Sequence, residues 1–301
     1  MIPGPVEISP AVLAASAAPP LGHLDPRFVG DFGAALGAMR RVWRAGPGAA
    51  PFVVAGGGTI AMEAAACNLI APGERALVVS TGYFGDRMAE MLRRRGAEVT
   101  ELEAPPGDAP AEAGVEVELE RALLGRRPFR ALFATHVDTS TGVRIDPEPL
   151  ARLARRFDAL SVFDGVCATA GERFEMAEWD ADLYFTASQK ALGLPAGLAL
   201  WVASPRALEA RSRLSAPPPL ALDWDAWRPV FEGYESGKPG YFSTPPTTLV
   251  AALRVGLDEL LAEADDPAAA MTAVWARHER AAQALRSAWR ALELAAVPAR
   301  A

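Results

Sequence analysis

Lysine is nearly absent from this sequence. Of its 30 basic residues only Lys190 and Lys238 are lysines, which leaves 30 − 2 = 28 arginines. Arginine keeps its proton at any ordinary pH, whereas a desolvated lysine can lose its proton and form a Schiff base with a carbonyl. A lysine that persists where arginine fills the other cationic positions is therefore a candidate for amine chemistry. Lys190, in the segment TASQKALGLP, is the first residue to consider.

Cysteine and histidine are also scarce. The two cysteines, Cys67 and Cys167, lie among apolar or small residues without the spacing of metal ligands. We expect two reduced and partly buried thiols. The three histidines, His23, His136 and His278, are far apart in the sequence. A metal site has few candidate ligands here, and we expect none.

Charge and hydropathy exclude further classes. The net charge is −7 and the arginines are scattered among acids, which leaves no basic stripe for nucleic acid. No apolar run approaches the length of about 18 residues that a membrane span requires. The opening MIPGPVEISP lacks the charged and apolar regions of a signal peptide. We therefore expect a soluble cytoplasmic protein without nucleic-acid or membrane partners.

The hydrophobic periodicity predicts an α/β fold. Short apolar runs such as PFVVA, RALVVS, RALFAT and LSVFD alternate with segments of helical spacing, the first of them at about 27–44. This alternation is typical of a mostly parallel sheet flanked by helices, because parallel neighbours need crossover connections. From Ser215 the pattern changes to a Pro-rich loop and an aromatic-rich stretch, and helices follow from about Thr247 to Leu292. We predict an N-terminal arm over 1–25, a large domain over 26–246, and a helical segment over 247–301.

Three predicted strands lead to residues that suit one ligand. PFVVA runs into GGGT (56–59) and then into a helix, so free N–H groups and a hydroxyl meet at a helix N-terminus, as in a phosphate site. LSVFD ends on Asp164, and DLYFTASQ leads to Lys190. Ligands bind at the carboxyl ends of parallel strands. A phosphate cradle, a carboxylate for a pyridinium nitrogen and a lysine for a Schiff base are the parts that pyridoxal 5′-phosphate requires.

Each feature also has another interpretation. A GGGT segment can be a simple turn, an acid at a strand end is commonly a cap, and a lysine is commonly a solvated surface residue. GGGTIA (56–61) also satisfies the dinucleotide pattern G-x-G-x-x-G/A. That pattern needs an acid near the end of the next strand, whereas RALVVSTG ends in Ser80, Thr81 and Gly82. An NAD site is an alternative that fits less of the sequence.

Longer motifs resemble those of the class V aminotransferases, and within them the alanine–glyoxylate and serine–glyoxylate aminotransferases. The resemblance covers nearly the whole chain. It is carried by VVAGGGTIAMEAAACNLIAPGERALVVSTGYFGDR, THVDTSTGV, FDGVCATAG, WDADLYFTASQKALGLPAGLAL and GYESGKPGYFSTPP. It implies the large domain of a fold-type-I, pyridoxal-phosphate-dependent transferase, assembled as a homodimer with active sites at the subunit interface.

The same resemblance implies roles for individual residues. Lys190 would bond to the cofactor and then serve as the acid and base of the proton shift, while Asp164 would keep the pyridine nitrogen protonated. Val166 would pack on one side of the ring and Phe84 would stack on the other. Many relatives have Trp at the latter position, and either ring can stack. The cofactor phosphate would be contacted by Gly57, Gly58, Thr59 and Gln189. Thr139 would lie near O3′ of the cofactor. The partner subunit would supply Tyr241 and Thr244.

The resemblance also implies a reaction, which is transamination between alanine or serine and glyoxylate or a similar 2-oxo acid. Relatives usually continue into a small C-terminal domain with an arginine for the substrate carboxylate. Here ELAAVPARA resembles the opening of that domain, so we expect it to be truncated. Three explanations stay open: a partial gene product, a domain supplied otherwise, or a dimer that binds the cofactor with little or no turnover.

Overall fold

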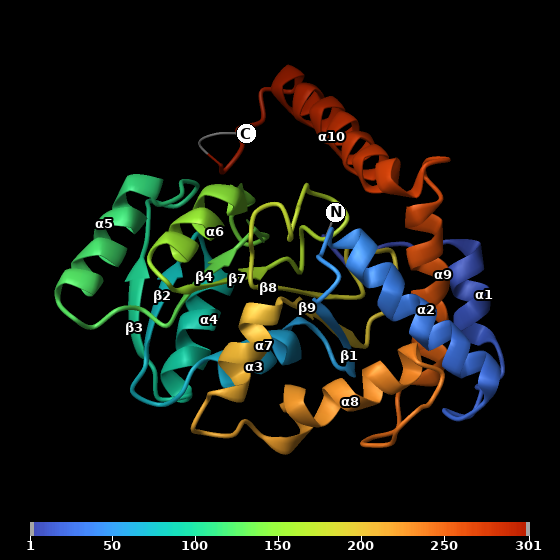
Figure 1. Cartoon of the computed structure of the whole chain (residues 1–301). Coiled ribbons are helices and arrows are strands. Elements are labelled where there is room, and N and C mark those ends of the chain that lie inside the picture. Colours follow the sequence, from blue (N-terminus) through green and yellow to red (C-terminus); the bar gives the residue numbers. More distant parts are fainter. Residues whose placement is uncertain (1–2, 299–301) are drawn as a thin grey trace.

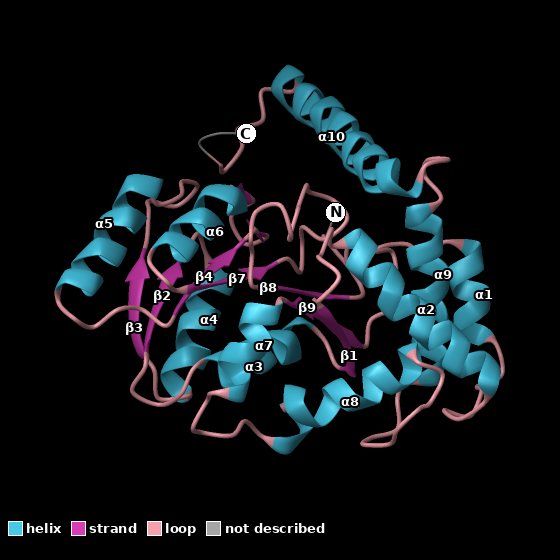
Figure 2. Ribbon diagram, viewed as in Figure 1, coloured by secondary structure: helices cyan, strands magenta, loops and turns pink. Residues whose placement is uncertain are grey.

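A computed structural model describes residues 3–298, and its centre is a seven-stranded sheet (Figures 1 and 2). The strand order is β1-β9-β8-β7-β4-β2-β3. Strands β8 to β3 in this order are parallel, and β9 is antiparallel to both of its neighbours. The strands are β1 (Ala50–Ala55), β2 (Arg75–Val79), β3 (Glu98–Leu102), β4 (Ala131–Thr135), β7 (Leu160–Asp164), β8 (Leu183–Ala187) and β9 (Leu198–Ala203). The prediction of a mostly parallel sheet is confirmed.

Helices cover both faces of this sheet. Helices α3, α4 and α7 pack together on one face, and α5 and α6 lie on the other (Figure 1). A short antiparallel pair, β5 (Val137–Asp138) with β6 (Val143–Arg144), follows β4. The helices are α1 (Pro10–Ala17), α2 (Pro26–Val42), α3 (Gly58–Leu69), α4 (Tyr83–Arg94), α5 (Glu112–Leu124), α6 (Pro147–Arg156), α7 (Pro205–Ser212), α8 (Trp224–Glu235), α9 (Thr247–Leu261) and α10 (Pro267–Ala291). In the described chain, none of them combines the length and apolar character of a membrane span.

The burial of the strands explains their composition. Every residue of β4, β7, β8 and β9 is buried, which is why these strands read as continuous apolar runs rather than as alternating patterns. Helix α6 shows the complementary pattern, with Leu150 and Leu153 buried and Arg152 exposed. Because β8, β7, β4, β2 and β3 are parallel, their carboxyl ends lie at one edge of the sheet, where ligands are expected.

Three helices, α1, α7 and α8, were not predicted. Helix α1 lies inside the expected N-terminal arm, where Ser9 caps it by accepting the N–H of Val12, whose side chain is buried. Helix α8 lies in the aromatic-rich stretch and contains Pro229, a residue that normally argues against a helix interior. Helix α9 packs against α1 and α2, and α10 follows it. The domain boundaries at 25 and 246 stay predictions.

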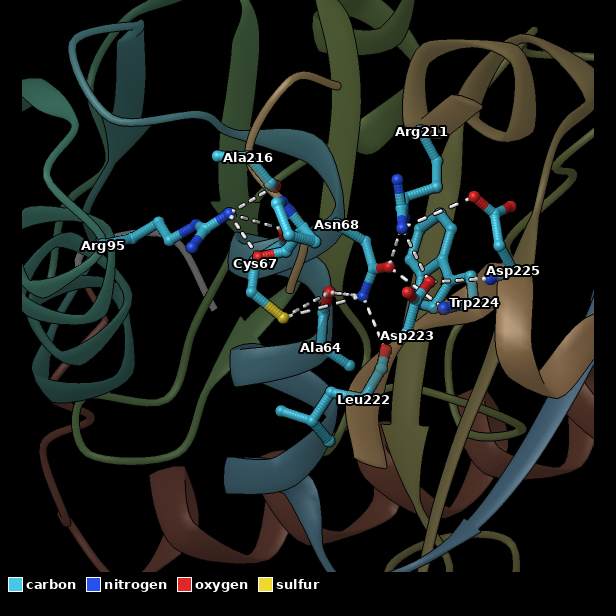
Figure 3. A network of polar contacts seen from close by, with 11 residues as sticks. Ala64, Cys67, Asn68, Arg95, Arg211, Ala216, Leu222, Asp223, Trp224 and Asp225 are labelled. Atoms are coloured by element: carbon cyan, nitrogen blue, oxygen red, sulfur yellow. Dashed lines mark hydrogen bonds and ion pairs between the residues drawn. The ribbon is translucent and has the colours of Figure 1, made fainter. Parts of the chain in front are cut away.

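A buried polar network fixes the far end of α3 (Figure 3). The Asn68 amide is fully buried and donates to the carbonyls of Ala64 and Leu222, each at 2.8 Å. Its Oδ1 accepts from Arg211 Nε at 3.0 Å and from the Trp224 N–H at 3.1 Å. One side chain thereby joins α3 to α7 and to the start of α8. The helix whose N-terminus is the predicted phosphate cradle is held at its other end.

Candidate active site

A pocket of about 210 Å³ lies at the carboxyl ends of the parallel strands. Its walls come from the start of α3, from α4, and from the residues at and after the ends of β4, β7 and β8. It collects most of the site residues expected from the sequence: Gly58, Thr59, Phe84, Asp164, Val166, Gln189 and Lys190.

Four expected residues lie outside the lining of this pocket. Gly57 is the N-cap of α3 and immediately precedes the lining residue Gly58. Thr139 lies two residues beyond Val137, which does line the pocket. The other two, Tyr241 and Thr244, are exposed on the loop before α9, with their hydroxyl oxygens 3.5 Å apart.

The start of α3 has the features of an anion cradle. No side chain caps this end of the helix, and the first N–H groups of any helix lack intrahelical partners. A β-carbon on Gly58 would lie 2.9 Å from Val166 Cγ2, so a side chain here would displace the pocket wall. Gly56 has φ +150°, a conformation that other residues rarely adopt. The glycine turn therefore leaves backbone donors without partners at the wall of the pocket.

Phe84 is positioned by Asp138, which the sequence analysis did not single out. The Asp138 carboxylate is fully buried and accepts the N–H groups of Phe84 at 2.9 Å and Gly85 at 3.4 Å, which fastens the first turn of α4. It also accepts the N–H and hydroxyl of Ser140, at 3.0 and 2.6 Å. The available signal was the DTSTG segment, because Asp commonly bonds the backbone two residues on.

Asp164 ends β7 with only 5% of its surface exposed. The pKa of its carboxyl is raised from 3.8 to about 7, mainly by burial. The hydrogen bond from the Val166 N–H opposes this shift, and the nearby charge of Asp138 adds a smaller contribution to it. That N–H donates to Oδ1 at 2.9 Å. A cationic partner would stabilise the ionised form of this poorly solvated carboxyl, because a nearby opposite charge favours the charged state.

The backbone beside Asp164 is held in place by Tyr184 and His136. A β-carbon on Gly165 would lie 2.2 Å from Tyr184 Cζ, so the tyrosine ring fills the space that a side chain would need. The Tyr184 hydroxyl forms a hydrogen bond with the ring Nδ1 of His136 at 2.9 Å. The backbone N–H of His136 donates to the backbone carbonyl of Asp164, also at 2.9 Å. Burial, with the charge of Arg144 as a second cause, lowers the pKa of His136 to about 3 and keeps its ring neutral.

The N-terminal segment lies against Lys190. A β-carbon on Gly4, which has φ +152°, would lie 2.7 Å from Lys190 Cδ and 2.8 Å from the Gln189 carbonyl oxygen. That carbonyl also accepts the N–H of Val6 at 3.3 Å. Among the described residues, Gln189 Oε1 is buried without a hydrogen-bond partner. The pocket thus holds a polar amide that a ligand can satisfy.

Comparisons with known proteins agree with this geometry. Residues 45–297 match the family "Aminotransferase class-V". The chain belongs to the class V aminotransferases. It is 38% identical over 275 residues to alanine–glyoxylate aminotransferase 1 of Saccharomyces cerevisiae, covering 87% of this chain and 70% of the yeast protein. It is 34% identical to L-aspartate–glyoxylate aminotransferase of Paracoccus denitrificans, covering 95% and 69%.

The fold agrees as well. The crystal structure of alanine–glyoxylate aminotransferase from Nostoc sp. has a TM-score of 0.85 and 31% identity, covering 97% of this chain and 73% of that one. Class V aminotransferases are an enzyme family for which pyridoxal phosphate is the implied cofactor. The open N–H groups at Gly58 and the buried Asp164 carboxyl fit that group. The family assignment displaces the dinucleotide alternative.

Proposed function

We propose that this class V aminotransferase uses pyridoxal phosphate to transfer the amino group of alanine or serine to glyoxylate. The observation that carries the proposal is the pocket that joins Lys190, one of only two lysines, to the buried carboxyl of Asp164 and to the uncapped start of α3. The named functions of the relatives support glyoxylate as the acceptor and favour a working transaminase over a binding protein without turnover.

Bound pyridoxal phosphate supplies a carbonyl for the amino group and a ring that accepts electrons when the Cα–H bond of the donor breaks. Gly57, Gly58, Thr59 and the Gln189 amide hold the phosphate in this proposal, with Tyr241 and Thr244 supplied by the second subunit of a homodimer. Phe84 and Val166 confine the ring from its two sides, and Thr139 lies near O3′.

Two side chains carry the chemistry in this proposal. The Asp164 carboxylate accepts the N–H of the ring nitrogen and holds the proton there, since an ion pair favours both charged forms. Lys190 would hold the cofactor through Nζ, and the same amine would serve as the base and acid that move the Cα proton of the donor. Overall, donor amino acid and glyoxylate become a 2-oxo acid and glycine, so no external oxidant or reductant is needed.

The first prediction compares the two lysines. The parent protein and Lys238→Ala, loaded with pyridoxal phosphate, should show a visible absorbance band that borohydride removes, and Lys190→Ala should lack it. Lys238 is exposed and outside the pocket, which makes it a matched control. Transamination should fall by about 100-fold or more in Lys190→Ala only. A band that survives in Lys190→Ala would refute the assignment.

The donor is identified with the same band. L-alanine, L-serine and L-aspartate are each added to loaded protein, followed by glyoxylate, and we expect alanine or serine to bleach the band and glyoxylate to restore it. A band that forms but that no donor bleaches would support the alternative of a cofactor-binding dimer without turnover. Homodimer formation and a cytoplasmic location stay predictions.

A further inference from the structure

Arg87 is a cation in the pocket with no role assigned so far. It lies on α4, one turn beyond Phe84, and it lines the pocket. In residues 3–298, no carboxylate lies within ion-pair distance of its guanidinium, whereas Arg93 and Arg94 on the same helix pair with Glu101 and Glu90. An arginine without an acid is available for an anionic ligand.

The contacts of Arg87 are with neutral groups. Its guanidinium carbon lies 4.6 Å from the ring centre of Tyr83 and 5.5 Å from that of Phe84, and Nη2 donates to the Tyr83 hydroxyl. Nη1 lies 3.5 Å from Thr59 Oγ1. Stacking on two aromatic faces limits the motion of the guanidinium while leaving N–H groups for a further acceptor.

The contact with Thr59 identifies the end of the pocket to which Arg87 belongs. Thr59 is the second residue of α3, so the guanidinium lies beside the open N–H groups of that helix. The N-terminus of a helix carries a partial positive charge of about +0.5. A full positive charge beside a helix terminus of the same sign is unfavourable, and an anion between or beside them relieves the repulsion.

A transaminase offers two anions to such a site, the cofactor phosphate and the substrate carboxylate. We propose that Arg87 binds the phosphate of the cofactor, which adds a charged group from α4 to the backbone cradle of α3. The inference rests on the proposed function. The phosphate is favoured because the contact of Arg87 is with Thr59 of the cradle. A guanidinium fork suits the oxygens of a phosphate monoester, which has nearly two negative charges at neutral pH.

The second prediction uses two forms of the cofactor. Cofactor-free protein is titrated with pyridoxal phosphate and with pyridoxal, which has the same aldehyde and ring but no phosphate. In Arg87→Gln the dissociation constant for pyridoxal phosphate should rise about ten-fold, the effect of losing one charged hydrogen bond, while that for pyridoxal stays the same. Arg87→Lys should give a smaller loss, because the charge remains without the fork. The exposed, acid-paired Arg94→Gln is the control on the same helix.

The outcomes separate this inference from the proposed function. If Arg87→Gln lowered the affinity for pyridoxal phosphate and for pyridoxal equally, or changed neither, the role of Arg87 would be overturned. The binding of the cofactor by the parent protein through Lys190 would be unaffected by that result. A rise confined to the KM of the amino donor, in protein saturated with cofactor, would assign Arg87 to the substrate carboxylate and also overturn the inference. Failure of the parent to bind pyridoxal phosphate would overturn the proposed function itself. Melting temperatures of the cofactor-free variants verify folding, and Arg87→Lys carries the test if Arg87→Gln does not fold.

Discussion

Burial disfavours the ionised form of the Asp164 carboxyl, and the same burial gives it a reason to bind a cationic partner. Its carboxyl has few polar neighbours, and burial raises its pKa to about 7. In the unfolded chain the group would titrate near 3.8. Below about pH 4 the carboxyl is protonated in both states. Between about pH 4 and 7 the folded state holds a proton that the unfolded state has released, so this group makes the free energy of unfolding fall as the pH rises.

The third prediction follows from this sign. Asp164→Asn keeps an oxygen for the Val166 N–H but cannot ionise. In cofactor-free protein its free energy of unfolding should match the parent near pH 4 and exceed it above pH 7, by on the order of 2–4 kcal/mol. The same variant should lose transamination by about 100-fold or more, because the ring nitrogen loses its anionic partner. Denaturant titrations across this pH range, paired with single-turnover rates, measure both effects.

A stability difference that does not change with pH would contradict the buried, poorly solvated carboxyl. Unchanged rates would remove Asp164 from the chemistry. Each result is independent, since the first needs no cofactor. Greater stability combined with lower activity is the pattern expected of a group kept for function rather than for folding.

Site residues could be predicted only where a residue stands out by its rarity or by its position in a pattern. Lys190 stands out because lysine is rare, and Asp164 because it ends an apolar strand. Arg87 is one of 28 arginines, and nothing in the local sequence distinguishes it from Arg93 or Arg94. The role proposed for it depends on the absence of a paired acid among residues 3–298, which only the fold reveals. The close approach of Gly4 to Lys190 likewise joins residues that are remote in the sequence.

At the scale of elements, the position of α3 depends on contacts at both of its ends. The N-terminus forms the cradle, and Asn68 near the C-terminus joins the helix to α7 and α8. Arg211, which is 6% exposed, bonds Asn68 and also pairs with Asp223 at 2.7 Å. The charge is therefore buried, hydrogen-bonded and paired, and the arrangement is sensitive to the loss of any one member.

The fourth prediction is that Asn68→Ala lowers the free energy of unfolding by about 3 kcal/mol, because the variant leaves an arginine N–H, a backbone N–H and a carbonyl buried without partners. The control is Gln283→Ala, which removes an exposed amide from α10 and should change stability by less than about 0.5 kcal/mol. Denaturant unfolding of both variants measures the difference. Equal, small effects would show that water or rearranged neighbours replace the Asn68 contacts.

Element type was predictable where periodicity was strong. The buried strands and the helices between them follow the apolar patterns closely, since each pattern reflects a face packed on the sheet. Helix α8 was missed because Pro229 indicates a break, while packing of Trp224, Trp227 and Phe231 stabilises the helix around it. The antiparallel direction of β9 could not be predicted from its composition, since a fully buried strand looks the same in either direction.

At the scale of the whole molecule, the proposed homodimer accounts for two expected site residues that lie outside the pocket of one chain. Tyr241 is 67% exposed and lies outside the pocket, with Thr244 beside it. A large exposed aromatic with a hydroxyl is a common feature of protein interfaces, where the ring is buried and the hydroxyl finds a polar partner. A homodimer with two-fold symmetry would bring the same loop of each subunit to the other subunit, and so complete two equivalent sites.

The last prediction tests this exchange of residues. Lys190→Ala and Tyr241→Ala subunits should each have low activity, measured at limiting cofactor. In a mixed dimer, one site combines both substitutions and the other combines Lys190 with a parental Tyr241 from its partner. After subunit exchange, an equimolar mixture should therefore recover about a quarter of parental activity. The control mixture pairs Lys190→Ala with Asp164→Asn, two residues of one pocket, and should recover none. Light scattering establishes the dimer. A dimer that exchanges subunits without recovery would show that Tyr241 does not serve its partner, since a tyrosine acting within its own chain leaves every mixed site defective.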